Sequence, residues 1–367
     1  LGGQIPALSL NWHYRSRHES LISFSNSSYY GGGLVTFPSP STDDQAVRLQ
    51  HVPGGIFQRG GARTNEVEAK ALVRELTNRM LRNVGAKDKL SFGVVTFNSE
   101  QRTLINDLLD QERRKNSDLE IYFSDENPEA CFSKNIETVQ GDERDVIFFS
   151  ITFGKDPKDR ITMNFGPMNS PGGERRLNVA ITRARRELIV FSSIKAEQID
   201  LSRTAATGVQ DLKRFLDFAE RGKIALADAA TQPLGDYENI FEEAIGESLQ
   251  KLGWSVHPQV GVSGYRIDLG IVNPDMPGRY LAGVECDGAT YHSSHTARDR
   301  DKVREGILRG LKWEILRVWS TDWWINRQGA TEKLDNKLKQ LLENSREEER
   351  ERQRQLEAER SEPEAVE

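Results

Sequence analysis

Hydrophobic residues in the first half of the chain form short continuous runs, separated by segments with helical spacing. Residues 91–97 and 145–151 are apolar runs of the length expected for strands that are buried on both faces. In residues 66–81 and 99–111, apolar positions recur every three to four residues, as on one side of a helix. This alternation predicts an α/β fold over residues 1–195, with a parallel sheet and helices on both of its faces.

The pattern changes after residue 195. An amphipathic helix is expected at residues 210–219, and Pro233 with Gly235 then marks a break. Strand-like and helix-like segments resume after the break, and the C-terminal residues are rich in charge. We therefore predict four parts: the first domain at 1–195, a helical linker at 196–235, a smaller α/β domain at 236–342, and a tail at 343–367 that is helical or disordered.

Composition leaves nucleic-acid binding open. Most of the net charge of −6 lies in residues 343–367, which hold ten acidic and five basic residues, so the rest of the chain is close to neutral. Two cysteines give neither a disulfide framework nor a zinc-binding spacing. No apolar run is long enough to cross a membrane. We expect a cytoplasmic protein and, because the chain starts at Leu1, a piece of a longer one.

Five of the six tryptophans follow residue 250. We expect Trp254 and Trp313 to pack in the core of the smaller domain. Trp323 and Trp324 follow the last expected strand and are candidates for a surface position near DNA, where indole rings can stack on bases, although no other sequence feature supports stacking there.

Acidic residues interrupt two expected strands of the smaller domain. Asp268 lies in the first strand, and Glu285 and Asp287 lie in the second. Side chains alternate along a strand, so Glu285 and Asp287 are expected on one face and Cys286 on the other. Converging carboxylates repel each other unless a cation lies among them, and hard oxygen ligands suit Mg²⁺ or Mn²⁺. Such a site can hold a phosphodiester and activate water against it.

These residues resemble the PD-(D/E)xK nuclease superfamily, in the branch of the very-short-patch-repair endonucleases. The resemblance covers residues 236–330 and includes the run E-C-D-G-A-T-Y-H at 285–292. It implies a restriction-endonuclease-like fold and metal-dependent hydrolysis of nucleic acid. It also implies that Glu242, on the first helix of the domain, joins Asp268, Glu285 and Asp287 as a metal ligand.

The chain departs from this family at one position. The lysine of the usual E-x-K is replaced by Asp287, so the group that orients the water must come from elsewhere. The resemblance makes His292 the first candidate for general base or acid, beside the catalytic acids Asp268, Glu285 and Asp287. Arg298 and Lys302 are candidates for contacts to the scissile phosphate.

Three segments of the first domain resemble motifs of superfamily 1 helicases, in the group of the nonsense-mediated-decay helicase. The segments are N-W-H-Y-R-S-R-H at 11–18, E-T-V-Q-G-D-E-R-D at 137–145 and L-N-V-A-I-T-R-A-R at 177–185. The resemblance implies a second RecA-like domain whose guanidinium groups stabilise the γ-phosphate of ATP. The residues that it assigns to ATP are Arg15, Gln140, Gly141, Glu143 and Arg183, with Thr138 near the nucleic-acid track.

The chain has no G-x-x-x-x-G-K-[S/T] loop and no Walker B pair of acids. The resemblance places these parts in a preceding RecA-like domain of the same parent chain. We therefore expect ATP to be a cofactor only of the longer protein, and no ATP hydrolysis by this chain alone.

The combined prediction is the C-terminal part of an ATP-dependent helicase–nuclease. Its expected partners are nucleic acid, with DNA favoured over RNA, and the preceding RecA-like domain; its expected cofactor is Mg²⁺ or Mn²⁺. Such fusions suggest DNA restriction, repair or defence. One alternative is a nucleic-acid-binding module that has lost catalysis with the E-x-K lysine. Another is a scaffold whose RecA-like domain only docks partners.

Overall fold

The chain folds into two compact units. Unit 1 consists of Leu1–Thr36 and Asp44–Gln232, and unit 2 consists of Phe37–Asp43 and Pro233–Glu367. The computed structural model describes residues 13, 15–41, 46–86, 88–222, 224–226, 237–261, 266–287 and 304–361.

Unit 1 contains a five-stranded sheet in which every neighbouring pair of strands is parallel. The strand order is β1-β5-β4-β2-β3. The strands are β1 (Val47–His51), β2 (Phe92–Thr96), β3 (Phe132–Asn135), β4 (Arg144–Ser150) and β5 (Ala184–Ser192). The predicted parallel α/β fold is confirmed.

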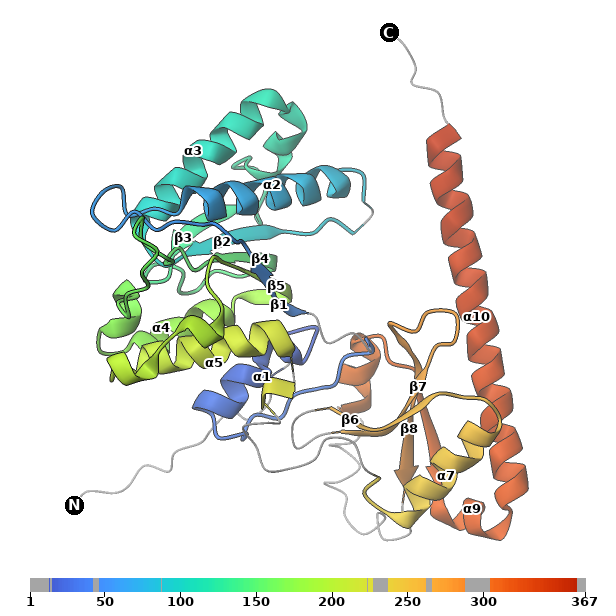
Figure 1. The fold of residues 1–367 in the computed structure, drawn as a ribbon. Helices are drawn as coiled ribbons and strands as arrows, with labels where there is room; N and C mark the ends of the chain where they lie inside the picture. The colour runs from blue at the N-terminus through green and yellow to red at the C-terminus, as the bar shows by residue number, and fades with distance from the viewer. Residues whose placement is uncertain are drawn as a thin grey trace, which may run out of the picture. The chain divides into compact units, whose positions relative to one another are not determined.

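Helices cover both faces of this sheet (Figure 1). Alternate residues of β4 point to opposite faces: Phe148 packs in the cluster with α2 and α3, and Phe149 packs in the cluster with α1, α4 and α5. Burial on both faces explains the continuous apolar runs of the sequence. The helices are α1 (Ser20–Tyr29), α2 (Glu66–Asn83), α3 (Ser99–Lys115), α4 (Gly173–Ile181) and α5 (Thr207–Arg221), with short 3₁₀ turns at Ser117–Tyr122, Gly166–Asn169, Ala196–Gln198 and Leu201–Arg203.

Helix α5 lies in the segment where the sequence suggested a linker. Its apolar stripe, with Leu212, Phe215 and Leu216, is fully buried in the core of unit 1. The ring of Phe215 contacts that of Phe24 on α1, with centroids 5.3 Å apart. The helix is therefore an integral part of the helical layer on that face of the sheet.

A buried acid lies beside the carboxyl ends of β4 and β5. Glu68 of α2 is completely buried and accepts hydrogen bonds from Ser150 Oγ and the Thr152 amide, both at 2.6 Å. Burial raises the pKa of Glu68 to about 7, although these hydrogen bonds oppose the shift. At neutral pH the carboxyl group is therefore close to half-protonated.

This acid should make the stability of unit 1 depend on pH. The folded-state pKa of about 7 exceeds the ordinary value of 4.5, so folding binds a proton. The free energy of unfolding therefore falls as the pH rises from 4.5 through 7, by about 3 kcal/mol. Glu68→Gln should remove that part of the dependence, as measured by denaturation followed by circular dichroism at pH 5 and pH 8. Glu66→Gln, two residues earlier on α2 and exposed, is the control and should keep the wild-type fall in stability between pH 5 and pH 8. An unchanged dependence in Glu68→Gln would contradict this account.

Unit 2 contains a four-stranded sheet of order β6-β7-β8-β9. β6 to β8 are antiparallel neighbours, and β9 is parallel to β8. Gly270 and Gly283 are paired across β7 and β8, and a Cβ atom on either would collide with neighbouring side chains. The strands are β6 (Val256–Val260), β7 (Ile267–Val272), β8 (Tyr280–Asp287) and β9 (Ile315–Trp319). This mixed sheet confirms the predicted smaller α/β domain.

Helices α7 (Ile240–Lys251) and α10 (Arg327–Ser361) pack on this sheet through Ile245, Leu249 and Leu338. Residues 304–310 are helical, and a short helix α9 (Ser320–Ile325) follows β9. Trp254 and Trp313 are buried as predicted.

The prediction for Trp323 was wrong. Its side chain is completely buried against the core of unit 2, whereas Trp324 is 59% exposed. Consecutive residues of α9 point in different directions, so one indole faces the core and the next faces outward. Its position directly after the last strand gave no indication of which indole would turn inward.

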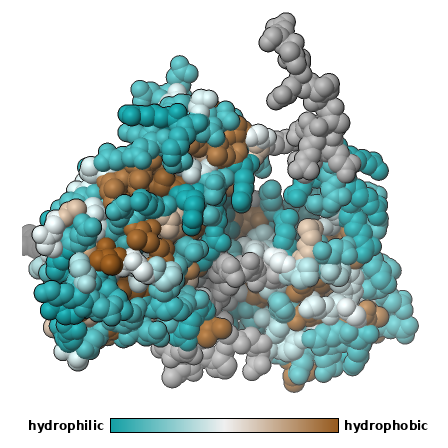
Figure 2. Space-filling view, turned by 45° about the horizontal axis from the view of Figure 1, so that its top comes forward, coloured by the Kyte–Doolittle hydropathy of each residue, from teal (hydrophilic) through white to brown (hydrophobic). Residues whose placement is uncertain are grey.

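The surface is largely polar on the face seen in Figure 2, where hydrophobic residues gather in several separate patches. Among the described helices, none combines the length and the apolar character needed to cross a membrane.

Candidate nucleotide and nuclease sites

Three of the residues assigned to ATP lie together at the amino-terminal edge of the unit 1 sheet. Glu143 directly precedes β4 and Arg183 directly precedes β5, and these parallel neighbours begin in register, at Arg144 and Ala184. Arg15 Nε lies 3.0 Å from Glu143 Oε2. The segment of Arg15 is held at this edge by the amide of Arg17, which donates to the Arg185 carbonyl at 2.8 Å.

Arg15 and Arg183 form a concentration of positive charge. Burial lowers the pKa of Arg183, and the charge of Arg15 lowers it further. Arg183 Nε donates to the Val179 carbonyl at 2.6 Å, which fixes its guanidinium at the end of α4. An anion beside the two guanidinium groups would relieve their repulsion, as a nucleotide phosphate does.

The other residues that the motifs assigned, Thr138, Gln140 and Gly141, lie in the loop between β3 and β4. Gln140 and Gly141 are exposed in the loop before β4, and Gly141 has a φ of 92°, which favours glycine. Thr138 bonds to Asn135, which ends β3 at the opposite, carboxyl edge of the sheet. The structure therefore places Thr138 at the other edge of the sheet from Glu143, with which Arg15 pairs.

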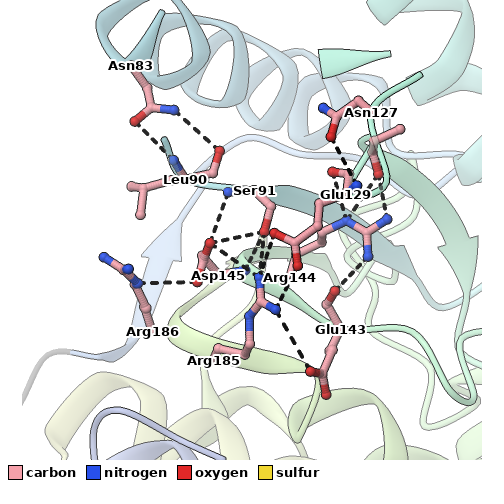
Figure 3. A network of polar contacts seen from close by, with 11 residues as sticks. Asn83, Leu90, Ser91, Asn127, Glu129, Glu143, Arg144, Asp145, Arg185 and Arg186 are labelled. Carbon is pink, nitrogen blue, oxygen red and sulfur yellow. Dashed lines mark hydrogen bonds and ion pairs between the residues drawn. The ribbon is translucent and has the colours of Figure 1, made fainter. Parts of the chain in front are cut away.

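A polar network surrounds Arg185 and includes Glu143 (Figure 3). Arg185 is at its centre: its guanidinium contacts Glu129 at 2.7 Å, Asp145 at 3.3 Å and Glu143 at 3.9 Å, and donates to Ser91 Oγ at 2.9 Å. The hydrogen bond from Arg185 lowers the pKa of Glu129. Sequence reasoning did not assign a role to Arg185, although it lies two residues after Arg183 in the same motif.

Glu242, which is buried, and Asp268, which is half-buried, are acids at one end of the unit 2 sheet. Asp268 Oδ2 accepts the Cys286 amide at 2.7 Å. Burial raises the pKa of Asp268 to about 7, and the charges of Glu242 and Asp287 raise it further. Glu242, 3% exposed, accepts hydrogen bonds from Gln259 Nε2 at 2.8 Å and from Asn239 Nδ2 at 2.6 Å.

Glu285 and Asp287, at the end of β8, face arginines. Glu285 Oε2 lies 3.9 Å from Arg304 Nη2, and Asp287 Oδ2 lies 3.6 Å from Arg317 Nη1. Burial and the nearby charge of Arg317 lower the pKa of Arg304 to about 10. Cys286 packs against the core instead, as alternation along the strand predicts, and burial with the surrounding acids raises the pKa of its thiol.

These residues fit a divalent cation in their chemistry but not in their present arrangement. Carboxylate oxygens are the ligands that Mg²⁺ prefers, and a cation would relieve the repulsion around Asp268. Within the described ranges, however, no three His, Cys, Asp or Glu side chains are grouped closely enough to hold a metal ion. His292, Arg298 and Lys302 lie outside the described residues.

Comparison with known proteins identifies both units. A family model described as an AAA domain matches residues 2–195, more than half of the chain. The chain belongs to this AAA domain family. A second family model, the restriction-endonuclease-like REase_MTES_1575, matches residues 241–338, after the AAA domain.

Two curated relatives are both named as uncharacterised ATP-dependent helicases. One, from Mycoplasma pneumoniae, is 31% identical over 344 residues, and the other, from Mycoplasma genitalium, is 28% identical over 347 residues. Each match covers 90% of this chain and 29% of the relative, so the chain spans less than a third of their length. A solved C-terminal domain of a possible DNA helicase from Lactobacillus covers 49% of the chain and is itself covered to 86%, at 11% identity; its TM-score of 0.29 does not define a shared fold.

The predicted resemblance to a helicase fused to an endonuclease-like domain is therefore confirmed. The sequence did not single out Gln259, Arg304 or Arg317 of the endonuclease-like domain. Gln259 lies in β6 with no motif around it. Arg317 reaches Asp287 through the pairing of β8 with β9, and Arg304 reaches Glu285 from the helical residues 304–310.

Proposed function

We propose that this chain is part of an ATP-dependent helicase whose restriction-endonuclease-like domain hydrolyses the phosphodiester backbone of nucleic acid with Mg²⁺ or Mn²⁺. The family matches support a helicase with a nuclease-like module. The observation that supports the hydrolytic activity is the half-buried Asp268 carboxyl, whose pKa is raised to about 7 by desolvation and by the nearby charges of Glu242 and Asp287. Buried acids with raised pKa values are typical of catalytic and metal sites.

The proposed roles rest on the chemistry of the side chains and on the resemblance of their sequence to the nuclease family. Asp268, Glu242, Glu285 and Asp287 would hold the cation, which when bound supplies a water of lowered pKa and charge neutralisation at the phosphate. Arg304 and Arg317, now beside Glu285 and Asp287, are positioned to take a phosphate oxygen of the substrate. His292 remains the candidate for proton transfer, and Arg298 and Lys302 for phosphate contacts.

In unit 1 we propose that Arg15, Arg183 and Glu143 contact ATP in the full-length protein, with Gln140 and Gly141 beside them. Their grouping at one edge of the sheet supports this assignment. The other half of the nucleotide site would come from a preceding RecA-like domain. We further propose DNA as the substrate and restriction, repair or defence as the role. Two free cysteines suit the reducing cytoplasm.

Cleavage by the complete chain tests the nuclease proposal. Labelled single- and double-stranded DNA and RNA would be incubated with the chain in Mg²⁺, in Mn²⁺ and in EDTA. We expect cutting of DNA in either cation and none in EDTA. Equal cutting in EDTA would show that hydrolysis does not need the cation, and would contradict the proposed mechanism.

A second candidate function is nucleic-acid binding without hydrolysis. The arginines beside Glu285 and Asp287 favour it, because ion-paired carboxylates are not arranged to hold a metal. In that case DNA would bind with the same affinity in Mg²⁺ and in EDTA, and no cutting would appear with any substrate. A DNA-binding titration beside the cleavage assay separates the two functions.

A further inference from the structure

A segment from the N-terminal part of the chain completes the fold of unit 2. We call residues 37–41 the strap. Ser41 forms an antiparallel bridge with Arg279, and the Tyr280 amide donates to the Pro40 carbonyl at 2.7 Å. Trp313 Nε1 donates to the Pro38 carbonyl at 2.8 Å. The strap therefore extends the sheet at the beginning of β8.

The contacts of the strap belong to the core of unit 2. Trp313 is 2% exposed, and its ring stacks on that of Tyr280, with centroids 5.2 Å apart. The Tyr280 hydroxyl in turn lies 2.9 Å from His257 Nδ1 on β6. Phe37 of the strap is 5% exposed. A buried indole N–H that loses its acceptor carries the full cost of desolvation, so Trp313 favours the strap in its present position.

The residues directly before the strap form hydrogen bonds with residues 13–19 of unit 1, the segment that contains Arg15. The His13 amide donates to the Val35 carbonyl at 2.9 Å, and Thr36 Oγ1 donates to the Glu19 carboxylate. Arg15 lies between His13 and Glu19 in the chain and pairs with Glu143.

A continuous path of covalent and hydrogen bonds therefore connects the Arg15 segment of unit 1 to the strap. It runs from the Arg15–Glu143 ion pair to Val35 and Thr36, and from there through the peptide bond to Phe37 and the strap. Proline fixes its own φ, so Pro38 and Pro40 restrict the backbone conformations that the strap can adopt. The strand that the strap holds, β8, ends at the acids Glu285 and Asp287.

We propose that the strap is a conformational link that transmits the state of the Arg15 segment to β8 of the endonuclease-like domain. A change at Arg15, such as loss of its partner Glu143, shifts the residues bonded to the segment and changes how firmly the strap holds Tyr280 and Trp313. Any control of cleavage by ATP rests on the proposed function. The link itself rests on the contacts above, and hydrogen exchange tests it without any cleavage assay.

The forward test changes a residue of unit 1 and measures amide exchange in unit 2. In the complete chain, Arg15→Ala and Glu143→Gln each break the ion pair, and we expect amide exchange in residues 278–284 to become at least threefold faster. Arg79→Ala is the control, because it breaks the ion pairs with Glu75 at 2.8 Å and Glu187 at 2.5 Å elsewhere in unit 1. The proposal would be overturned if Arg15→Ala and Glu143→Gln left exchange in residues 278–284 at the wild-type rate. It would also be overturned if Arg79→Ala accelerated that exchange equally.

The reverse test changes a residue of unit 2 and measures amide exchange in unit 1, because coupling between two sites is reciprocal. Trp313→Phe keeps an aromatic ring beside Tyr280 but removes the donor to Pro38, and exchange in residues 34–36 should become faster. Trp254→Phe removes a similar indole bond, to Asp335 at 2.8 Å, in the same unit and should leave residues 34–36 unchanged. Unchanged exchange there in Trp313→Phe would restrict the strap to a local structural role and overturn the proposed link.

Discussion

Asp268→Asn is expected to reduce metal-dependent DNA cleavage by at least about 100-fold. Asparagine has nearly the same size and keeps an oxygen for the Cys286 amide, so the contact at 2.7 Å can be retained. The substitution removes only the negative charge that the cation needs at the centre of the acidic site. The initial rate of cutting of labelled DNA in saturating Mg²⁺ measures the loss.

The matched control is Asp275→Asn in the same unit. Asp275 lies in the turn before β8, where it pairs with Arg346 at 2.6 Å, and it has no contact with the acidic site. We expect this variant to cut at the wild-type rate and Asp268→Asn to bind DNA while cutting poorly. If the two variants cut equally well, Asp268 is not part of a metal site, and hydrolysis, where present, occurs elsewhere.

Arg183→Ala should have the second large effect, on ATP hydrolysis by the full-length protein. An arginine that stabilises the transferring phosphoryl group contributes about 10³-fold or more to kcat. Arg183 is suited to this role because burial lowers its pKa and Val179 fixes its guanidinium at the edge where Arg15 and Glu143 meet. We expect kcat to fall by about this factor while the KM for ATP changes much less.

Arg175→Ala provides the comparison. Arg175 is on the same helix, its side chain is 89% exposed, and its ion-pair partner is the adjacent Glu174 at 3.8 Å. Removing this charge should leave ATP hydrolysis unchanged. A normal kcat in Arg183→Ala would show that Arg183 is a structural residue of α4, and the scaffold alternative for unit 1 would then gain support.

The sequence predicted the sheet of unit 1 well because its strands are buried on both faces. Val146 and Phe148 face one layer of helices and Ile147 and Phe149 face the other, so four consecutive positions of β4 are apolar. The acids of unit 2 were also found from sequence, because charges inside otherwise apolar strands are rare and stand out.

Features that depend on long-range pairing could not be predicted. Arg317 faces Asp287 only because β9 pairs with β8 in one register, and a shift of one residue would turn it to the other face. The strap has no local signal either, since Pro38 meets a tryptophan 275 residues later in the chain. For α5, the amphipathic pattern was recognised, but a stripe of apolar residues does not say which sheet it covers.

The strap also has a consequence for how the protein is made. Residues 37–41 leave the ribosome long before Tyr280 and Trp313. They therefore remain without their final partners while the rest of unit 1 is synthesised. Unit 2 can be completed only when its last strands close a loop of 275 residues onto them. A gene cut at residue 233 would therefore encode a unit 2 that lacks the strap, and the indole N–H of Trp313 would lose its acceptor.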